Sequence, residues 1–181
     1  MMYDPFARGQ YPVGVRSAAS TPAEPGQGAP APLELWYPAA SRHRGQDLAA
    51  ATQDHYTFFG MSLTQEAVRD AAPAAGVFPL VVFSHGIAGH RRQSTFFCTH
   101  LASHGYLVAA PDHGGNALSD LLPLALRARS ESLHNEIAEL MQKYVVDRAR
   151  DLRCVLDASA SGALAFPVAI AAGVALTGHS L

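Results

Sequence analysis

The feature that most constrains the fold is a predicted strand–helix–strand unit over residues 77–111. Residues 77–86, VFPLVVFSHG, form a continuous apolar run, which is typical of a strand buried on both faces. The segment STFFCTHLASHG that follows predicts a helix, because Ser94 can cap its start and Gly105 can end it. The run YLVAAP then predicts a second strand. Two strands joined by one helix over so short a stretch form a βαβ unit, so we expect a sheet that is at least partly parallel.

Two more segments predict strands. The run LELWYP alternates in the manner of a strand, with one set of side chains on each face: Leu33, Leu35 and Tyr37 on one, and Glu34 and Trp36 on the other. The apolar run GVALT, residues 173–177, predicts another strand shortly before the last residue given.

Helices and loops are predicted between these strands. Residues 17–32 are rich in Pro, Ala, Gly and Ser and predict an exposed loop, while residues 39–76 predict a long connection with one or two short helices. One long helix or two in succession are predicted from two sets of apolar residues at helical spacing. The first set is Leu133, Ile137, Leu140 and Tyr144, and the second, one register on, is Val145, Ala149, Leu152 and Leu156. We expect one partial domain over residues 1–181, with strands and long loops in 1–76 and the βαβ core in 77–181.

Composition limits the classes of partner. The net charge is only −2 and charged residues make up 15% of the chain, so no strong field favours nucleic acid or an anionic membrane. No apolar run is long enough to span a bilayer, and the N-terminus carries no signal-peptide pattern. The two cysteines, Cys98 and Cys154, lie among apolar residues and lack the spacing of a disulfide framework, so we expect two buried thiols. We expect a cytoplasmic protein with a small uncharged ligand.

The predicted strand over residues 173–177 leads into a turn of the kind that carries a nucleophilic serine. Gly178-His179-Ser180 is the first half of the G-x-S-x-G turn, which lifts a serine hydroxyl above the carboxyl edge of a parallel sheet. The backbone N–H of Leu181 would be one donor to an oxyanion. The second donor is expected in the loop after the first core strand, SHGIAG, where we select the N–H of Ile87.

At these residues the chain resembles the bacterial α/β-hydrolases of the platelet-activating-factor acetylhydrolase and predicted dienelactone hydrolase group. The resemblance is carried by LELWYPA, by FPLVVFSHGIAGHRRQSTFFCTHLASHGYLVAAPDHGGN, by VVDRARDLRCVLD and by ALTGHSL. It implies an α/β-hydrolase fold, a mostly parallel sheet flanked by helices, and a serine ester hydrolase that uses no cofactor and no metal. Short-chain or lipid-like esters are the implied substrates. The catalytic role falls on Ser180, and a serine there disfavours the true dienelactone hydrolase activity, which uses cysteine.

The resemblance also implies residues that line the site and others that are absent. His85, Gly86, His179, Asp112 and His113 match positions that line the site or support its loops. In this fold the triad acid and base follow the serine in chain order, and only Leu181 follows Ser180, so we expect a partial fold that is nearly inactive by itself.

Three alternatives remain open from the residues alone. Asp112 and His113 could replace the absent acid and base, since they follow a strand at the same sheet edge. The chain could instead be a non-catalytic half-domain or binding module that needs a complementary chain. Metal-assisted hydrolysis is a third reading, because His100 and His104 are four residues apart, although His104 also suits the C-terminus of a helix. Neighbouring Arg91 and Arg92 are expected to be solvated.

Overall fold

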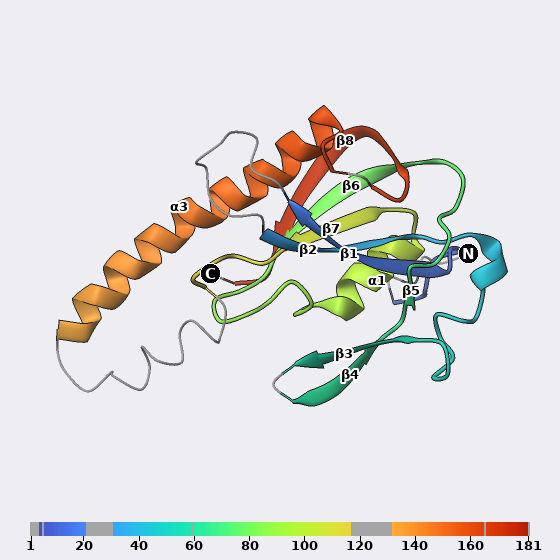
Figure 1. Cartoon of the computed structure of the whole chain (residues 1–181), viewed down its shortest axis with the longest axis horizontal. Coiled ribbons are helices and arrows are strands. Elements are labelled where there is room, and N and C mark those ends of the chain that lie inside the picture. The colour runs from blue at the N-terminus through green and yellow to red at the C-terminus, as the bar shows by residue number, and fades with distance from the viewer. Residues whose placement is uncertain are drawn as a thin grey trace.

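A mixed six-stranded sheet forms the centre of the molecule (Figure 1). The computed structural model describes residue 4 and residues 6–20, 31–58, 60–116, 132–164 and 166–180. The strand order is β5-β1-β2-β7-β6-β8, with bounds β1 Val13–Ser20, β2 Ala31–Pro38, β5 Val68–Arg69, β6 Val77–Ser84, β7 Leu107–Pro111 and β8 Ala169–Gly178. The connections include a short helical turn, η1 (Ser41–His43), and two long helices, α1 (Thr95–Ser103) and α3 (Ser132–Ser161).

The expected βαβ unit is confirmed. Strand β6 pairs in parallel with β7 on one side and with β8 on the other, so three carboxyl ends meet at one edge of the sheet. Helix α1 joins β6 to β7 and ends before Gly105, which takes the left-handed conformation that glycine tolerates best (φ 94°). Ser94 does precede α1, but its side chain makes no capping hydrogen bond.

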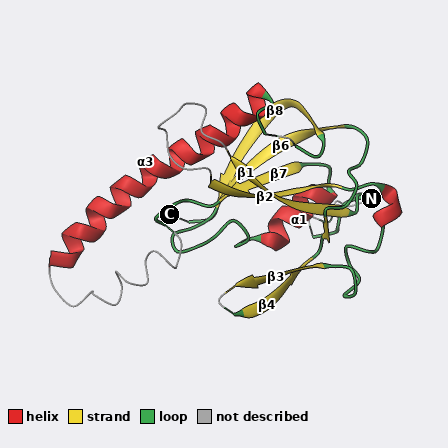
Figure 2. Ribbon diagram, viewed as in Figure 1, coloured by secondary structure: helices red, strands yellow, loops and turns green. Residues whose placement is uncertain are grey.

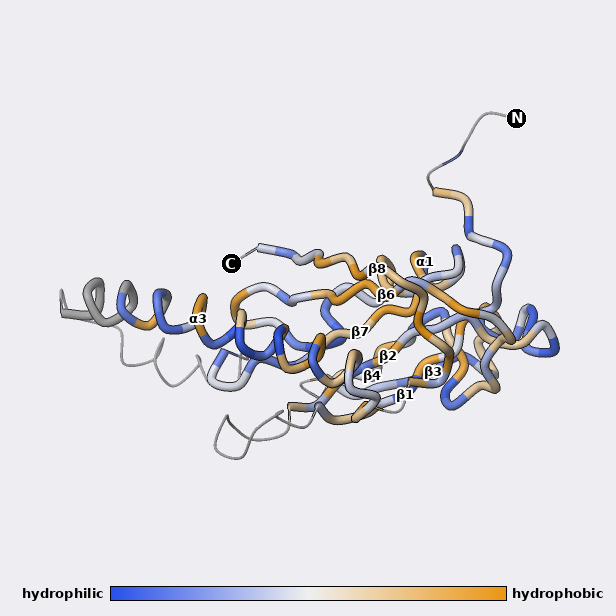
Figure 3. Tube along the Cα trace, turned by 90° about the horizontal axis from the view of Figure 1, so that it is seen from above, coloured by the Kyte–Doolittle hydropathy of each residue, from blue (hydrophilic) through white to orange (hydrophobic). Residues whose placement is uncertain are grey.

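Each face of the sheet is covered by one helix (Figure 2). On one face, Val155 and Ala158 of α3 pack against strand residues that include Leu80, and on the other, Cys98 and Ala102 of α1 pack against a set that includes Val81. The alternation expected in β2 sorts its side chains onto these two faces: Leu33, Leu35 and Tyr37 lie in the α3 layer and Trp36 in the α1 layer. Figure 3 shows the consequence, with β6 and β7 coloured as hydrophobic and α3 alternating along its length.

The first part of the chain differs from expectation in two respects. Among the described residues of 39–76 one short helix is present, η1, as expected, but the connection also holds a hairpin, β3 (Asp54–Phe58) and β4 (Met61–Gln65), and strand β5, which were not predicted. These strands form through pairing with distant or facing segments, which local propensity does not encode. The loop expected over residues 17–32 is shorter, because β1 continues to residue 20 and β2 begins at residue 31; residues 21–30 lie outside the described part.

The buried face of α3 matches the expected one only in part. The side chains most buried along the described part of this helix are Tyr144, Arg148, Val155 and Ala158. Tyr144 of the first predicted set is thus buried, while the side chains of Leu133 and Ile137 lie outside the described part. In the second set Leu152 and Leu156 pack against the core, whereas Val145 and Ala149 are exposed. The buried face contains a charged residue, Arg148. A hydropathy pattern does not recognise a face that includes an arginine.

Arg91 and Arg92 are not solvated as expected, because they converge on a buried carboxylate. Glu34 is fully buried on β2, and its oxygens lie 2.8 Å from a guanidinium nitrogen of Arg69 and 3.0 Å from one of Arg92. Arg91 is 3.5 Å from the same carboxylate. Two further carboxylates, Asp54 with Arg69 and Asp112 with Arg91, balance the three arginines. The charge cluster thus ties the hairpin and the loop after β6 to the sheet.

Burial and charge act in opposite directions on Arg69. Its burial lowers the pKa, but the hydrogen bond to Asp54 and the charge of Glu34 outweigh this and raise the pKa above its ordinary value. The guanidinium is therefore held in the charged form that the cluster needs.

Replacing the central carboxylate tests this cluster. Glu34→Gln is expected to lower the free energy of unfolding by about 3 kcal/mol, because three arginines lose the buried anion that compensates them. Chemical denaturation would measure the loss. Asp70→Asn, which breaks the exposed pair with Arg16, is the matched control and should cost less than about 1 kcal/mol; equal losses would contradict the role given to Glu34.

Candidate active site

The turn after β8 brings Ser180 to the carboxyl edge of the sheet. Gly178, the last residue of β8, pairs with Ser84, the last residue of β6, and the N–H of His179 donates to the Ser84 carbonyl over 3.0 Å. Ser180 then has a φ of 47°, a left-handed value that a residue with a side chain adopts only at some cost. The sharp, strained turn is the geometry that exposes a nucleophilic serine.

The turn packs directly against the loop that follows β6. A Cβ added to Gly86 would lie 2.9 Å from the carbonyl oxygen of His179 and 3.1 Å from its Nδ1. No side chain fits this gap without displacement, so the glycine permits the close approach of the two segments. The segments that follow β6 and β8, nearly a hundred positions apart in sequence, thereby face each other at one site.

Residues 86–89 form a tight turn with Ile87 inside it. The N–H of Gly89 donates to the Gly86 carbonyl over 3.0 Å, and Ala88 has a φ of 59°. The turn is fixed on both sides, since the N–H of Ala88 donates to the Asn116 carbonyl and the N–H of Gly86 donates to the Gln93 side chain. The oxyanion role of the Ile87 N–H stays a prediction, and Leu181 lies outside the described residues.

His85 connects this turn to the loop after β7. Its Nδ1 lies 2.8 Å from the Gly86 carbonyl, and its Nε2 lies 3.1 Å from the backbone nitrogen of His113, which donates to it. The first contact requires a proton on Nδ1 and the second requires a lone pair on Nε2, so the ring is neutral. Burial lowers the pKa of His85 to about 4, which agrees with a ring that accepts rather than donates at Nε2.

Asp112 and His113, the alternative acid and base, do not bond to each other through their side chains. Asp112 binds Arg91 through both its side chain and the Arg91 backbone N–H, which anchors the loop after β6. His113 binds elsewhere: its Nε2 is 2.9 Å from Ser84 Oγ, and its Nδ1 is 2.8 Å from an oxygen of Asp151 on α3. The ring nitrogen that would act as base is therefore hydrogen-bonded to Ser84 in this structure.

Ser84 and Asp151 were missed by the sequence analysis. Ser84 was treated only as the end of a strand. Asp151 is the third position after Arg148 and the fourth before Val155, so it shares the stripe of α3 that faces the sheet. A carboxylate that faces the sheet needs a polar partner there. That requirement could have indicated from the sequence that Asp151 binds a residue near the sheet.

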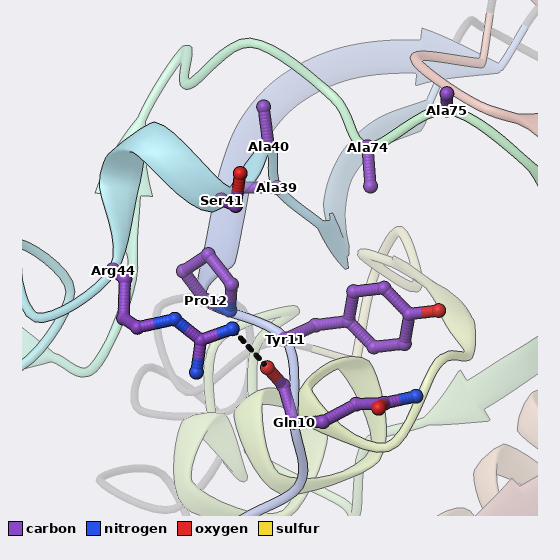
Figure 4. A pocket seen from close by; sticks show the side chains of 9 residues that line it. All are labelled: Gln10, Tyr11, Pro12, Ala39, Ala40, Ser41, Arg44, Ala74 and Ala75. Atoms are coloured by element: carbon purple, nitrogen blue, oxygen red, sulfur yellow. Dashed lines mark hydrogen bonds between the residues drawn. The ribbon is translucent and has the colours of Figure 1, made fainter.

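Two other candidate sites lie away from this edge. The rings of His100 and His104 are 4.5 Å apart, but His104 caps α1 and bonds the Ala7 carbonyl, and no metal-binding group of side chains occurs in the described residues. A cavity of about 330 Å³ lies at the amino ends of the parallel strands, the opposite edge from Ser180 (Figure 4). It is lined by Gln10, Tyr11, Pro12, Ala39, Ala40, Ser41, Arg44, Ala74 and Ala75.

Comparison with known proteins identifies the family. The family model for platelet-activating factor acetylhydrolase, isoform II, matches residues 55–147, just over half of the chain. The chain belongs to this family. The matched span holds the loop after β6 and the end of β7, whereas Ser180 lies beyond it.

Individual relatives agree with this assignment. The chain is 30% identical over 94 residues to platelet-activating factor acetylhydrolase of Gallus gallus, which is 51% of this chain and 22% of the relative. The enzyme of the same name from Bos taurus is 36% identical over 62 residues, or 34% of this chain and 14% of the relative. The chain spans less than a quarter of each of these two proteins.

The fold is that of a solved esterase. Ferulic acid esterase from Streptomyces cinnamoneus matches 94% of this chain and 52% of its own, with a TM-score of 0.58 and 26% identity. The expected α/β-hydrolase fold is therefore confirmed, and the family is one of acetylhydrolase and esterase-type enzymes. Among the described residues, no helix has both the length and the apolar character that a bilayer crossing requires.

The close approach at Gly86 can be tested by adding a methyl group. Gly86→Ala is expected to destabilise the protein by about 1–3 kcal/mol, because the new Cβ meets the His179 backbone and ring. Thermal or chemical denaturation measures this. Gly114→Ala is the control, since its added Cβ meets nothing within 4 Å, and it should leave stability nearly unchanged.

Burial of His85 predicts a pH dependence of stability. With the pKa lowered from 6.5 to about 4, the unfolded chain takes up a proton before the folded one does as the pH falls. The contribution of His85 is thus complete above pH 6.5 and is lost as the pH falls towards 4, by about 3 kcal/mol in total. Glutamine can still accept the His113 N–H, so His85→Gln should show a shallower decline in unfolding free energy over this range. Parallel curves for both proteins would count against the assignment.

Proposed function

We propose that this protein is a serine carboxylic-ester hydrolase in which Ser180 attacks the ester carbonyl and forms an acyl-enzyme intermediate. The observation that carries the proposal is the strained turn at Ser180, at the carboxyl end of β8 and against the turn of residues 86–89. This places a serine beside a backbone turn suited to an oxyanion hole.

The proposed roles of the neighbouring groups follow from the geometry. The N–H of Ile87 and that of Leu181 would donate to the oxyanion, while Gly86 and His179 hold the two segments together. His85, Asp112 and His113 support the loops rather than exchange protons with the substrate, because each is committed to another protein group. The histidine base of this fold follows the nucleophile in chain order, so we do not assign it to any of these residues.

The proposed substrates are short-chain or lipid-like esters. The support is the acetylhydrolase and esterase character of the similar proteins, together with the low net charge of the chain. No cofactor or metal takes part in the proposed reaction. A cytoplasmic location stays a prediction.

A serine-directed phosphonate tests the proposal. The full-length protein should be labelled at Ser180, as located by peptide mass spectrometry. Ser180→Ala should abolish the label and lower the esterase activity by at least about 10⁴-fold. Ser62→Ala is the control, because Ser62 also follows a Gly-x pair but lies in the hairpin strand β4. Absence of label at Ser180 would refute the proposed nucleophile.

A further inference from the structure

A line of hydrogen bonds beside the candidate site has no role in the proposed reaction. Ser84 Oγ lies 2.9 Å from His113 Nε2, and His113 Nδ1 lies 2.8 Å from Asp151 Oδ2. Three separate elements supply these groups: the end of β6, the loop after β7, and α3. We refer to Ser84, His113 and Asp151 as the relay.

The chemistry of the relay fixes the proton on the ring. The side chain of His113 is 1% exposed and that of Asp151 is 28% exposed, so the pair is largely removed from water. An ionised carboxylate can only accept, and His113 must therefore donate from Nδ1. In the neutral ring, Nε2 is then left to accept the Ser84 hydroxyl proton, which is the tautomer that an aspartate enforces in Ser-His-Asp sites.

The relay reaches both halves of the candidate site. Through Ser84 it contacts the turn at Ser180, because the Ser84 carbonyl accepts the N–H of His179. Through the backbone of His113 it contacts the turn of residues 86–89, because that N–H donates to His85, whose other nitrogen binds the Gly86 carbonyl. One residue, His113, thus links the two backbone segments, through its ring on one side and its backbone N–H on the other.

We propose that Asp151 and His113 are positioning residues that set the spacing between the nucleophile turn at Ser180 and the oxyanion turn of residues 86–89. The inference rests on the proposed function. Asp151 orients the ring from α3, and the ring bonds Ser84 and packs against the ring of His85, at 4.7 Å between centroids. The relay acts on catalysis without contacting the substrate.

A mechanical consequence follows for helix α3. The other charged residue on its inner stripe, Arg148, donates to the Asn116 side chain, and the Asn116 carbonyl accepts the N–H of Ala88. Two side chains of α3, one anionic and one cationic, therefore reach the loops around the site. The helix is coupled to the site geometry as well as covering the core.

The test compares Asp151→Asn with Asp157→Asn in the full-length protein. Asp157 lies on the same helix and pairs with Arg153 on its exposed side, which makes it the matched control. Asp151→Asn is expected to slow phosphonate labelling of Ser180, and kcat, by about 10²-fold with little change in KM, because displaced groups at the site lose their alignment. Asp157→Asn should match the unmodified protein.

A spectroscopic measurement separates positioning from simple loss of structure. Nitrogen NMR of the His113 ring should show the Nδ1–H tautomer in the unmodified protein and a shift towards Nε2–H in Asp151→Asn, because a carboxamide can donate to Nδ1. If Asp151→Asn does not fold, Ser84→Ala is the second variant, because it removes the hydroxyl that bonds His113. Ser84→Ala should slow labelling of Ser180 by about tenfold, which is less than the 10²-fold expected for Asp151→Asn.

Each outcome decides the inference. Unchanged labelling in a folded Asp151→Asn protein, or an Nε2–H tautomer in the unmodified protein, would overturn it. Label at Ser84 would also overturn it, because the relay would then be a nucleophilic site. If the unmodified protein is not labelled at Ser180, the proposed function fails, and the tautomer measurement still decides whether the relay is built as inferred.

Discussion

The parallel pairing of β6 with β7 and β8 is the constraint on which the rest of the structure depends. Parallel strands end at the same edge of a sheet, so the loops after all three strands meet there. The pairing of Ser84 with Gly178 sets the depth at which the turn of Ser180 emerges. The loop after β6 and the loop after β7 start at this same edge and therefore lie beside the turn.

The sequence predicted those parts of the fold in which one strong local pattern dominates. The apolar runs of β6 and β7 could be predicted because strands buried on both faces read as continuous apolar stretches. The run of β8 has the same apolar character, although this strand lies at the edge of the sheet and is largely exposed. The hairpin β3–β4 could not be predicted, because its stability comes from pairing and from contacts with distant residues, such as the hydrogen bond that the Trp36 indole donates to the Gln65 side chain. On the inner stripe of α3, Tyr144 was predicted but Arg148 was not, because a charged residue interrupts an apolar pattern. Composition-based reasoning placed Arg91 and Arg92 in solvent for the same reason: a charge is assigned to the surface unless its partner, here Glu34, is known.

Buried polar groups in this chain occur where loops must be held against the sheet. Glu34 fixes the loop after β6 from one face through Arg91 and Arg92, and Asp151 fixes the loop after β7 from the other through His113. An apolar core constrains shape weakly at such a boundary, since hydrophobic contact has no direction. Hydrogen bonds with defined donors and acceptors specify a position, and removing one partner of such a pair carries a large cost.

Backbone strain at the site has a matching explanation. Ala88 and Ser180 both have left-handed φ values, 59° and 47°, and each such residue costs on the order of 1–3 kcal/mol. Asp70 shares this conformation, but aspartate tolerates it better than most residues do. The two strained residues at the site lie on opposite sides of the contact between Gly86 and His179, and the hydrogen bonds from Ala88 to Asn116 and from His179 to Ser84 hold them there. In the proposed reaction, Ser180 and the turn of residues 86–89 would need no rearrangement as charge develops between them, because both are already held in these conformations. Preorganisation of this kind is a physical reason for a fold to keep strained residues at a site.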